Sequence, residues 1–330
     1  MALVFIAIGL LALYLILKGS EWITDASVDV ARRLSTTNIA VGLLLVATLL
    51  SLPELVVALS SVAKGHTGMG IGVTLGSVIV NIGLIVGISA LIRPLRVSRA
   101  MIVRDAVFMV VITIVVAAVA LEDLELTRVD GFIFLLLFIP YLVNVYEQER
   151  VLTTKQRTVE TQKIVKSLRL FGKTGFGELV VHDGLKVFLA GVALLLIGGE
   201  LFTHSMIGIA GFFGLSDFVI GITLGALGPS LPNLASAVQA AKRGYEELAV
   251  SETIGSNIFT MLITLGVIAL ATPQPINFVT AVVTTPAMLL LSFLLLFFMM
   301  RGRIGRRAGA ALLAIYLLAT ILQLVVPNIF

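Results

Sequence analysis

The sequence predicts an all-α polytopic membrane protein of ten transmembrane helices, arranged as two inverted repeats of five helices. Three observations support this prediction: an apolar composition, ten apolar stretches long enough to cross a bilayer, and a repeat at a fixed offset. Of the 330 residues 58% are hydrophobic and 13% are charged, whereas soluble domains have about 25% charged residues. A chain of this length cannot bury so many apolar side chains in its own interior, so lipid must be part of its solvent.

The composition also excludes several classes of function. The net charge of +4 is typical of basic cytoplasmic loops and does not indicate a nucleic-acid partner. Because the chain has no cysteine, it has no disulfide, thiolate metal site or cysteine nucleophile. It has neither a His-Glu-x-x-His motif nor a Ser–His pair placed for catalysis. We therefore expect no enzyme and no cofactor; the expected partners are the lipid bilayer and inorganic cations, and no oligomer is implied.

Each predicted span is a helix, because backbone polar groups in lipid must be satisfied within the segment and the apolar periods are helical. A span needs about 20 apolar residues. The first stretch, at about 1.5 Å per residue, is longer than a 30 Å hydrocarbon core requires. The ten predicted spans are 2–31, 38–62, 70–92, 102–121, 131–146, 184–210, 217–240, 248–271, 278–300 and 308–328.

The basic residues predict the orientation in the cell (inner) membrane. Nineteen of the 23 Lys and Arg follow odd-numbered spans, whereas the loops after even-numbered spans hold only Lys64 and Arg128. By the positive-inside rule the nineteen are cytoplasmic and both termini are outside. Residues 147–183 then form a basic cytoplasmic linker between a first repeat, 1–146, and a second repeat, 184–330. A lipid-binding or regulatory role for this linker is the alternative.

An internal repeat relates the two halves at an offset of 179 residues without a gap. Five spans separate equivalent positions, and because five is odd the halves face opposite ways across the membrane. Inverted repeats are the architecture of secondary transporters, with the binding site at the midplane between the repeats. Matching pairs include Gly19 and Gly198, Glu21 and Glu200, Ala47 and Ala226, Ser51 and Ser230, Pro53 and Pro232, Thr74 and Thr253, and Ser77 and Ser256.

Polar residues interrupt the second span around a proline. Ser51 and Glu54 are three residues apart and share a helix face. Pro53 between them has no N–H, which leaves the carbonyl of Leu49 without its helical partner. A carboxylate at a helix centre costs roughly 2.5–3.5 kcal/mol on insertion scales, so Glu54 is the leading candidate for a cation ligand. The alternative is a protonated, hydrogen-bonded structural Glu.

The seventh span repeats this arrangement with Ser230, Pro232 and Asn233, and here the freed carbonyl belongs to Gly228. We therefore expect a broken helix with an exposed carbonyl in each half. For Asn233 the alternative role is an interhelical hydrogen bond.

Two neighbouring spans add further oxygen atoms at helical spacing. Ser77 and Asn81 are four residues apart in the third span, and Ser256 and Thr260 are four apart in the eighth. Hard cations prefer such oxygen ligands, and Ca²⁺ takes six to eight of them. The alternatives are interhelical bonding for Asn81 and, for the hydroxyl residues, back-bonding to the carbonyl four residues earlier.

Both repeats resemble the α-repeats of the cation/calcium antiporter superfamily, in its sodium/calcium exchanger branch of the prokaryotic type. That branch pairs G-T-S-L-P-E with G-S-N-I-x-N or G-S-N-I-x-D. The matching segments here are Leu49-Leu50-Ser51-Leu52-Pro53-Glu54, Gly76-Ser77-Val78-Ile79-Val80-Asn81, Gly228-Pro229-Ser230-Leu231-Pro232-Asn233 and Gly255-Ser256-Asn257-Ile258-Phe259-Thr260.

The resemblance implies a secondary-active antiporter of Na⁺ and Ca²⁺. Its cation site would be built from the second, third, seventh and eighth spans, with Glu54 as the central ligand. The first and sixth spans would be long, tilted helices that slide to alternate access. The implied metal-ligand set is Glu54, Ser51, Ala47, Ser77, Asn81, Ala226, Ser230, Asn233, Ser256 and Thr260, with Glu252 as an additional candidate.

The sequence departs from the branch at the centre of the site. The branch has a second Glu where Asn233 stands, and often Asp or Asn where Thr260 stands. A Ca²⁺ ion beside one carboxylate keeps a net positive charge in a low dielectric, which lowers divalent affinity. Glu252, four residues before Ser256 where the branch usually has Asn, can compensate; alternatively it is a solvated Glu at the cytoplasmic mouth.

Three functional hypotheses remain at this point. The first is a sodium/calcium-type antiporter, which the Ser-Leu-Pro context favours. The second is a proton-driven exchanger of calcium or another cation, in which a lone Glu54 alternates between H⁺ and the cation. The third is a degenerate relative that binds a cation without transporting it.

Overall fold

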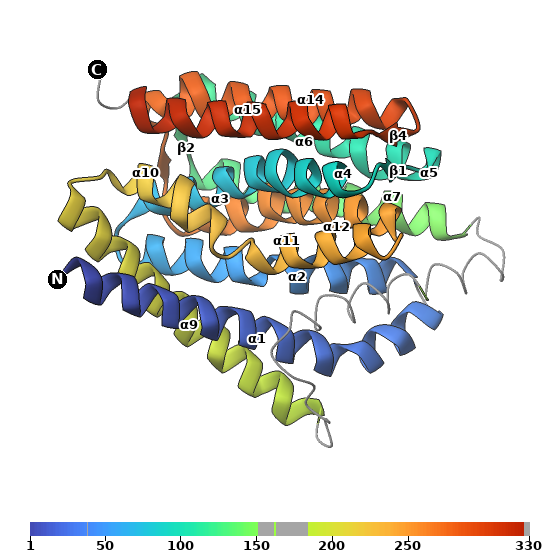
Figure 1. Ribbon diagram of the computed structural model, residues 1–330, viewed down its shortest axis with the longest axis horizontal. Coiled ribbons are helices and arrows are strands. Elements are labelled where there is room, and N and C mark those ends of the chain that lie inside the picture. Colours follow the sequence, from blue (N-terminus) through green and yellow to red (C-terminus); the bar gives the residue numbers. More distant parts are fainter. Residues whose placement is uncertain (38, 151–161, 163–183, 327–330) are drawn as a thin grey trace.

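The computed structural model describes residues 1–37, 39–150, 162 and 184–326, except for the side chains of 28–47, 100 and 148–150. The regular structure of these residues is helical apart from four two-residue strands. Eight of the described helices are long and apolar enough to cross a membrane. The predicted all-α polytopic fold is confirmed (Figure 1). Most of the predicted linker, 147–183, lies outside the described residues.

The first half contains five spans in the predicted order, and two of them continue from α-helix through a π-helical turn. Its elements are α1 (Ala2–Thr37), α2 (Ile39–Ala63), α3 (Thr67–Ile79), η1 (Val80–Val86), α4 (Gly87–Ile92), β1 (Leu95–Arg96), α5 (Arg99–Met101), η2 (Ile102–Ala106), α6 (Val107–Glu122), β2 (Glu125–Leu126) and α7 (Arg128–Arg150).

The second half repeats this series, with strands and π-helical turns at nearly equivalent positions. Its elements are α9 (Gly184–Phe213), α10 (Asp217–Ile220), η3 (Gly221–Gly225), α11 (Leu231–Lys242), α12 (Glu246–Phe259), η4 (Thr260–Thr264), α13 (Leu265–Ala271), β3 (Gln274–Pro275), η5 (Thr280–Thr284), α14 (Thr285–Met300), β4 (Arg303–Ile304) and α15 (Arg306–Val325).

The second and seventh spans differ from the expected pair of broken helices. The helix α2 is continuous with Pro53 inside it, so the expected break in the first half is wrong. The seventh span does break, between η3 and α11. There the carbonyl of Gly228 accepts a 3.2 Å hydrogen bond from the N–H of Leu231. The expected exposed carbonyl at Gly228 is therefore also wrong, because a tighter i→i+3 bond replaces the one that Pro232 cannot make.

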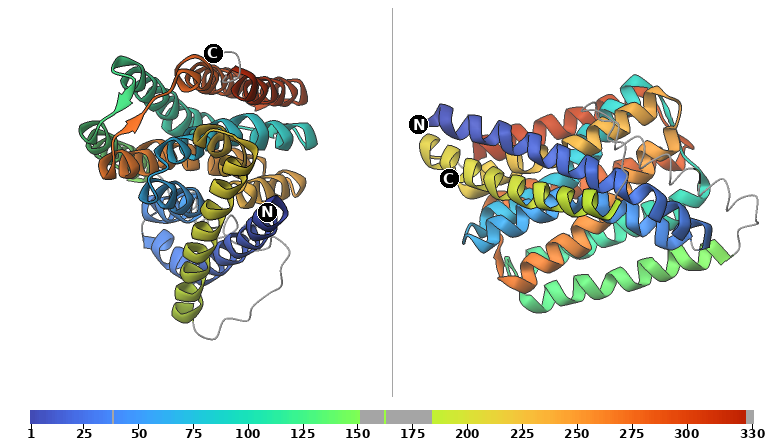
Figure 2. Two further views of the ribbon diagram at one scale, coloured as in Figure 1. Left: turned by 90° about the vertical axis from the view of Figure 1, so that its left-hand side faces the viewer. Right: turned by 90° about the horizontal axis from the view of Figure 1, so that it is seen from below.

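The long helices α1 and α9 cross in opposite directions (Figures 1 and 2). The Ser205 hydroxyl, near the end of α9, donates a 2.7 Å hydrogen bond to the carbonyl of Phe5, near the start of α1. Further along, Gly198 lies against Ala12, and Gly191 lies against Gly19. These two contacts are equivalent under the repeat, because Gly191 is the counterpart of Ala12 and Gly19 is the counterpart of Gly198. The two halves are therefore related by a pseudo-two-fold axis, as expected for inverted repeats.

This crossing depends on small residues, because a Cβ atom on Gly19 would lie 2.7 Å from the Gly191 carbonyl oxygen and the Leu195 nitrogen. We expect Gly19→Leu to separate the helices and to destabilise the folded protein by about 1–3 kcal/mol, the usual cost of overpacking. The matched control is Gly211→Leu on α9, where an added Cβ meets nothing within 4 Å. Thermal unfolding of the detergent-purified proteins measures the difference; equal melting temperatures for the two variants would contradict this account of the crossing.

The connecting loops gather at two opposite ends of the bundle. Strand β1 pairs with β4 at one end, and β2 pairs with β3 at the other (Figure 1). The first end also holds the Arg93–Glu246 ion pair at 2.6 Å, and the second holds the His66–Asp217 contact at 2.8 Å. Loops that follow odd-numbered spans thus meet one another, and loops that follow even-numbered spans meet at the opposite end.

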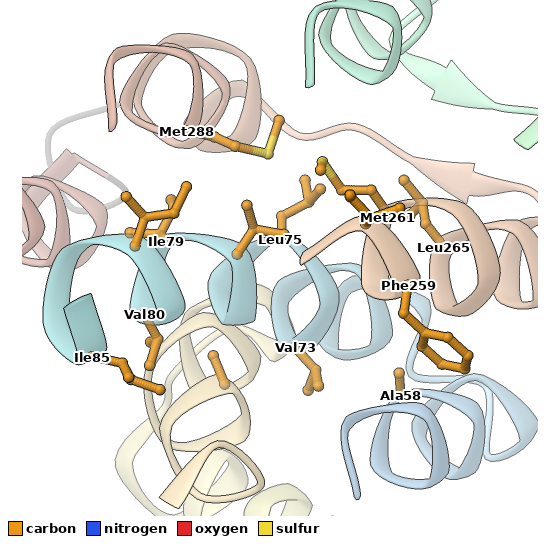
Figure 3. Packing of buried hydrophobic residues seen from close by; sticks show 14 of the residues in the cluster. Ala58, Val73, Leu75, Ile79, Val80, Ile85, Phe259, Met261, Leu265 and Met288 are labelled. Atoms are coloured by element: carbon orange, nitrogen blue, oxygen red, sulfur yellow. The ribbon is translucent and has the colours of Figure 1, made fainter. Parts of the chain in front are cut away.

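The third and eighth spans form the centre of the molecule. In their apolar windows 78% and 72% of the residues are buried inside the protein, against 17–28% for the first, fifth, sixth and tenth spans. Both spans contribute side chains to the buried hydrophobic cluster, among them Leu75 of α3 and Met261 of η4 (Figure 3). The outer helices present their apolar side chains outward, which suits a lipid solvent. Polar residues in the two central spans are therefore deeply buried.

Candidate cation site

The polar residues of the second, third, seventh and eighth spans meet in one cluster at the centre of the bundle. The hydroxyl groups of Ser51 and Ser256 share a hydrogen bond of 2.9 Å. The Ser230 hydroxyl donates to Glu54 Oε1 at 3.0 Å, and Asn233 Nδ2 donates to the same oxygen at 3.2 Å. Ser51 and Glu54, predicted to share a face of α2, both point at the second repeat. Each of these bonds therefore joins one repeat to the other.

The cluster lies on the pseudo-two-fold axis. Glu54 and Asn233 are equivalent residues, 179 positions apart, and they are in direct contact. Thr113 and Ser292 form a second such pair, with their hydroxyl oxygens 3.4 Å apart. Two equivalent residues that touch must lie beside the axis that relates them. The single central carboxylate thus lies where the two repeats meet.

Asn81 extends the cluster along α12. Its amide nitrogen donates to Asn257 Oδ1 at 2.9 Å and approaches Ser256 Oγ at 3.4 Å. Asn257 in turn donates to the sulfur of Met109 at 3.7 Å. Asn257 was not among the residues expected from the sequence. The sequence signal that points to Asn257 is a difference between the repeats: the equivalent residue of the first half is the apolar Val78.

Several buried oxygen atoms of the cluster have no hydrogen-bond partner in the described part of the chain. Leaving one such group unsatisfied costs about 1–3 kcal/mol. These oxygen atoms belong to carboxylate, amide or hydroxyl groups. Four of the residues that carry them form two pairs at the offset of 179, Glu54 with Asn233 and Asn81 with Thr260. The five atoms are Glu54 Oε2, Ser77 Oγ, Asn81 Oδ1, Asn233 Oδ1 and Thr260 Oγ1.

Two features of the chain bring these oxygens together. Gly76 lets α3 approach the seventh span, because a Cβ there would lie 2.7 Å from the Cβ of Ala226. This contact places Ala226 directly beside the turn of helix that carries Ser77. The π-helical turns η1 and η4 begin at Val80 and Thr260, so each passes through a site residue, and such turns often occur at functional sites. Ala47 lies in α2, but its surroundings are outside the described side chains.

The hydroxyl residues divide into two groups. Ser51, Ser230 and Ser256 form hydrogen bonds across helices, so back-bonding does not account for them. Thr74 and Thr253, which are also equivalent, do bond to the carbonyl four residues earlier, at 2.9 Å each. The interhelical serines are therefore available to a ligand, as are Ser77 and Thr260, whose hydroxyl groups have no partner in the described part of the chain.

Glu252 takes part in another hydrogen bond between α11 and α12. Its Oε2 accepts a 3.0 Å hydrogen bond from the hydroxyl of Ser236, a second residue that the sequence analysis did not single out. Ser236 follows Asn233 by three residues on α11, and Glu252 precedes Ser256 by four on α12. The Glu252–Ser236 pair is therefore one helical turn away from the central cluster on both helices.

Comparison with known families extends these observations over the whole chain. The family model described as sodium/calcium exchanger protein matches residues 4–147 and 184–325, which are the two halves of the structure. The matched ranges leave out most of the predicted linker.

Individual relatives match over most of their length. The sodium/calcium exchanger MaX1 of Methanosarcina acetivorans is 31% identical, over 93% of this chain and 95% of that protein. The inner membrane protein YrbG of Escherichia coli is 30% identical, over 82% and 81%. A solved structure of the sodium-calcium exchanger NCX_Mj is 29% identical, covers 97% of this chain and 98% of its own, and superposes with a TM-score of 0.67. The two-halved architecture and these matches show that this multi-pass membrane protein, a cation antiporter and not an enzyme, belongs to the sodium/calcium exchanger family.

Proposed function

We propose that the protein exchanges Ca²⁺ for Na⁺ across the membrane, with Glu54 as the central ligand of the transported cation. The observation that carries this proposal is the set of buried oxygen atoms without partners beside the pseudo-two-fold axis. Such a set is unfavourable by itself, but it matches the oxygen ligands that Na⁺ and Ca²⁺ require. A bound cation satisfies the oxygens and offsets the cost of burying the Glu54 carboxylate.

The remaining ligands follow from the same cluster. We assign side-chain oxygens to Ser51, Ser77, Asn81, Ser230, Asn233, Ser256 and Thr260, and backbone carbonyls to Ala47 and Ala226. Glu54 Oε1 is already held by Ser230 and Asn233, so the carboxylate is fixed in orientation and Oε2 faces the ion. In the proposed domain division, 1–146 and 184–330 each supply half of this ligand set, with 147–183 as the connecting linker.

Alternating access follows from the inverted repeats. We propose that α1 and α9 move together against the remaining helices, because their glycine-lined contact joins them along their length. Movement in one direction opens a path from the central cluster to the end that carries Arg93 and Glu246. The opposite movement opens the path to the end that carries His66 and Asp217.

The direct test is ⁴⁵Ca²⁺ uptake into proteoliposomes under an imposed Na⁺ gradient or an imposed H⁺ gradient, applied separately. Uptake driven by outward Na⁺ and unaffected by H⁺ is the expected result. No uptake above protein-free vesicles under either gradient would contradict transport and favour a relative that only binds cations.

A second candidate is exchange of Ca²⁺ or another cation for H⁺. The specific observation that favours it is that Glu54 is the one carboxylate within the described central cluster. A single carboxylate can alternate between a proton and a cation. In the same vesicles, uptake driven by a pH gradient in Na⁺-free medium would support this candidate in place of Na⁺ coupling.

The proposed orientation places the linker 147–183 in the cytoplasm and both termini outside. It is tested by cysteine labelling, since the chain has no cysteine of its own. Asp123 and Arg303 are exposed residues at nearly equivalent positions of the two repeats, at opposite ends of the bundle. We expect an impermeant maleimide applied to intact cells to label Asp123→Cys but to label Arg303→Cys only after permeabilisation. The reverse pattern would overturn the orientation.

A further inference from the structure

A cavity lies at one end of the bundle, where α14 and α15 are joined through β4 (Figure 1). Its volume is about 460 Å³, which is within the range of small-molecule sites. Three of the six residues that line it are arginines with exposed side chains. Within the part of the chain that the structure describes, none of the three has an acidic partner. The lining residues are Phe298, Arg301, Arg303, Gly305, Arg307 and Ala308.

Other arginines at this end of the bundle are paired with carboxylates. Arg93 Nε donates to Glu246 at 2.6 Å, and Arg96 Nε lies 3.7 Å from the same carboxylate. Arg104 donates to both oxygens of Asp105, at 2.7 and 2.6 Å. The charges of these arginines are therefore balanced within the protein, whereas the arginines of the cavity are available to an external anion.

The turn between α14 and β4 fixes the backbone of the cavity. Gly302 has a φ of +76°, in the left-handed region that glycine adopts readily. Its N–H donates to the carbonyl of Met299 at 2.8 Å, and its own carbonyl accepts from the N–H of Val97 at 3.2 Å. The second bond joins the turn to the first repeat, next to the pairing of β1 with β4. Arg301 and Arg303, on either side of Gly302, are therefore attached to a held backbone.

The start of α15 also favours an anion in the cavity. No side chain caps its first turn, and that turn contains no acidic residue. The N–H groups at the start of a helix and the helix dipole attract negative charge. Gly305, which precedes the helix, lines the cavity. Because a guanidinium group can donate two parallel hydrogen bonds to a phosphate, the three arginines and the helix start together suit a phosphate group.

An exposed apolar face of α14 ends beside the cavity. Phe293, Phe297 and Met300 follow the helical spacing i, i+4 and i+7, and they are 48%, 47% and 70% exposed. The guanidinium carbon of Arg301 lies 4.3 Å from the ring centroid of Phe297, so this face leads directly to an arginine of the cavity. An acyl chain would cover such a face, whereas a free phosphate would contact the arginines alone.

The fold does not require these arginines. At the opposite end of the bundle, the equivalent loop has Glu122 in place of Arg301 and Leu124 in place of Arg303. Both loops lead into a strand pair, β4 with β1 and β2 with β3. A preference for basic residues at one membrane face accounts for the sign of the charge, but it does not account for three arginines around one cavity.

We propose that this cavity binds the phosphate headgroup of an anionic phospholipid, with an acyl chain of the same lipid against Phe293, Phe297 and Met300. Basic pockets between membrane helices bind such headgroups in other membrane proteins. The headgroup supplies the negative charge that the cavity lacks, and the acyl chain covers the apolar face. In the orientation proposed above, this lipid belongs to the cytoplasmic leaflet.

Native mass spectrometry of the detergent-purified protein tests the site, because it counts bound lipids and gives their affinity. We expect wild type to bind phosphatidylglycerol more tightly than phosphatidylcholine with the same acyl chains, since the choline group adds a positive charge next to the arginines. Arg307→Gln should weaken phosphatidylglycerol binding about tenfold, as for the loss of one hydrogen bond to a charged group. The double variant Arg301→Glu and Arg303→Leu copies the equivalent loop, so it should fold and lose the preference for the anionic lipid.

Three controls accompany these variants. Arg306→Gln removes the same charge from the first turn of α15, outside the cavity lining, and should leave the affinity nearly unchanged. The double variant Phe293→Ala and Met300→Ala keeps the arginines but reduces the apolar face, and should weaken lipid binding severalfold. Inorganic phosphate at millimolar concentration should displace the lipid only weakly. Unfolding temperatures report whether each variant is intact.

The lipid site would be overturned by equal affinity of wild type for the two lipids. It would also be overturned by equal losses in Arg306→Gln and Arg307→Gln, or by unchanged binding in the variant that copies the equivalent loop. If inorganic phosphate displaces phosphatidylglycerol and the loss of Phe293 and Met300 has no effect, the cavity binds a soluble phosphate compound, and its assignment to a lipid is wrong.

Discussion

Glu54→Gln is expected to abolish cation exchange while leaving the protein folded and inserted. The substitution keeps the size of the side chain and an oxygen that can accept from Ser230 and Asn233, whose bonds to Glu54 Oε1 are 3.0 and 3.2 Å. What it removes is the negative charge. At a separation of about 4 Å and an effective dielectric near 20, one charge pair is worth about 4 kcal/mol, so we expect cation affinity at this site to fall by at least about 100-fold.

The measurement is ⁴⁵Ca²⁺ uptake into proteoliposomes, with elution profile and unfolding temperature as checks on the fold. Because Glu54 and Asn233 are equivalent residues, a double variant can test whether the transport activity is rescued. In the double variant Glu54→Asn and Asn233→Glu, the carboxylate moves to the equivalent position of the other repeat, where Ser51 is the counterpart of Ser230. We expect this exchange of residues to restore part of the uptake that Glu54→Gln lacks. Full transport by Glu54→Gln would show that Glu54 is not the ligand.

The arrangement of the spans was predictable from the sequence because lipid imposes a simple rule. Every stretch of about 20 apolar residues must form a helix, and the offset of 179 residues relates the two sets of helices. The predicted span 217–240 corresponds to α10, η3 and α11, and the predicted span 308–328 to α15. Helix bounds differ by a few residues because the ends depend on local capping, as at Ser216, whose hydroxyl accepts from the N–H of Val219.

The effect of the two prolines was not predictable from their positions. Proline removes one N–H wherever it stands, but the outcome depends on the residues before it. In α2, Pro53 is accommodated within a continuous helix. In the seventh span Gly228 and Pro229 precede the Ser-Leu-Pro motif, and the chain makes a turn in which Leu231 bonds to Gly228. Glycine and a second proline together allow the break that one proline alone does not cause.

The central site was predictable as a set of helices and faces, but its bonds were not. Helical spacing places Ser51 with Glu54 and Ser77 with Asn81, yet spacing cannot say which side chain of the other repeat each one meets. Asn257 and Ser236 do not stand out from the matching positions of the two repeats, because neither residue has a polar equivalent in the first half. The informative positions are mismatches, where a polar residue replaces valine: Asn257 for Val78, Ser236 for Val57 and Glu252 for Val73.

Asn233→Glu is expected to shift the central site toward Ca²⁺. The amide nitrogen of Asn233 donates to Glu54 Oε1 at 3.2 Å, so a Glu at this position replaces a hydrogen-bond donor with a second negative charge beside the first. Without a cation the two carboxylates repel each other, and with Ca²⁺ between them the charges balance. At an effective dielectric near 20, the added charge stabilises a divalent ion by several kcal/mol, part of which offsets the repulsion. We expect Ca²⁺ affinity to rise by about 10- to 100-fold, with slower turnover because release becomes harder.

Calorimetric Ca²⁺ titration of wild type, Asn233→Glu and Glu252→Gln separates two accounts of how this chain compensates for its single central carboxylate. If Glu252 makes no contact with the central ion, Asn233→Glu tightens Ca²⁺ binding and Glu252→Gln leaves it nearly unchanged. If Glu252 already supplies the second charge to the central ion, a third carboxylate overcharges the site, and both variants bind Ca²⁺ more weakly than wild type. The hydrogen bond that Glu252 accepts from Ser236, one helical turn from Asn233 and Ser256, favours the first outcome. Weaker binding in both variants would place Glu252 in the coordination shell of the central ion.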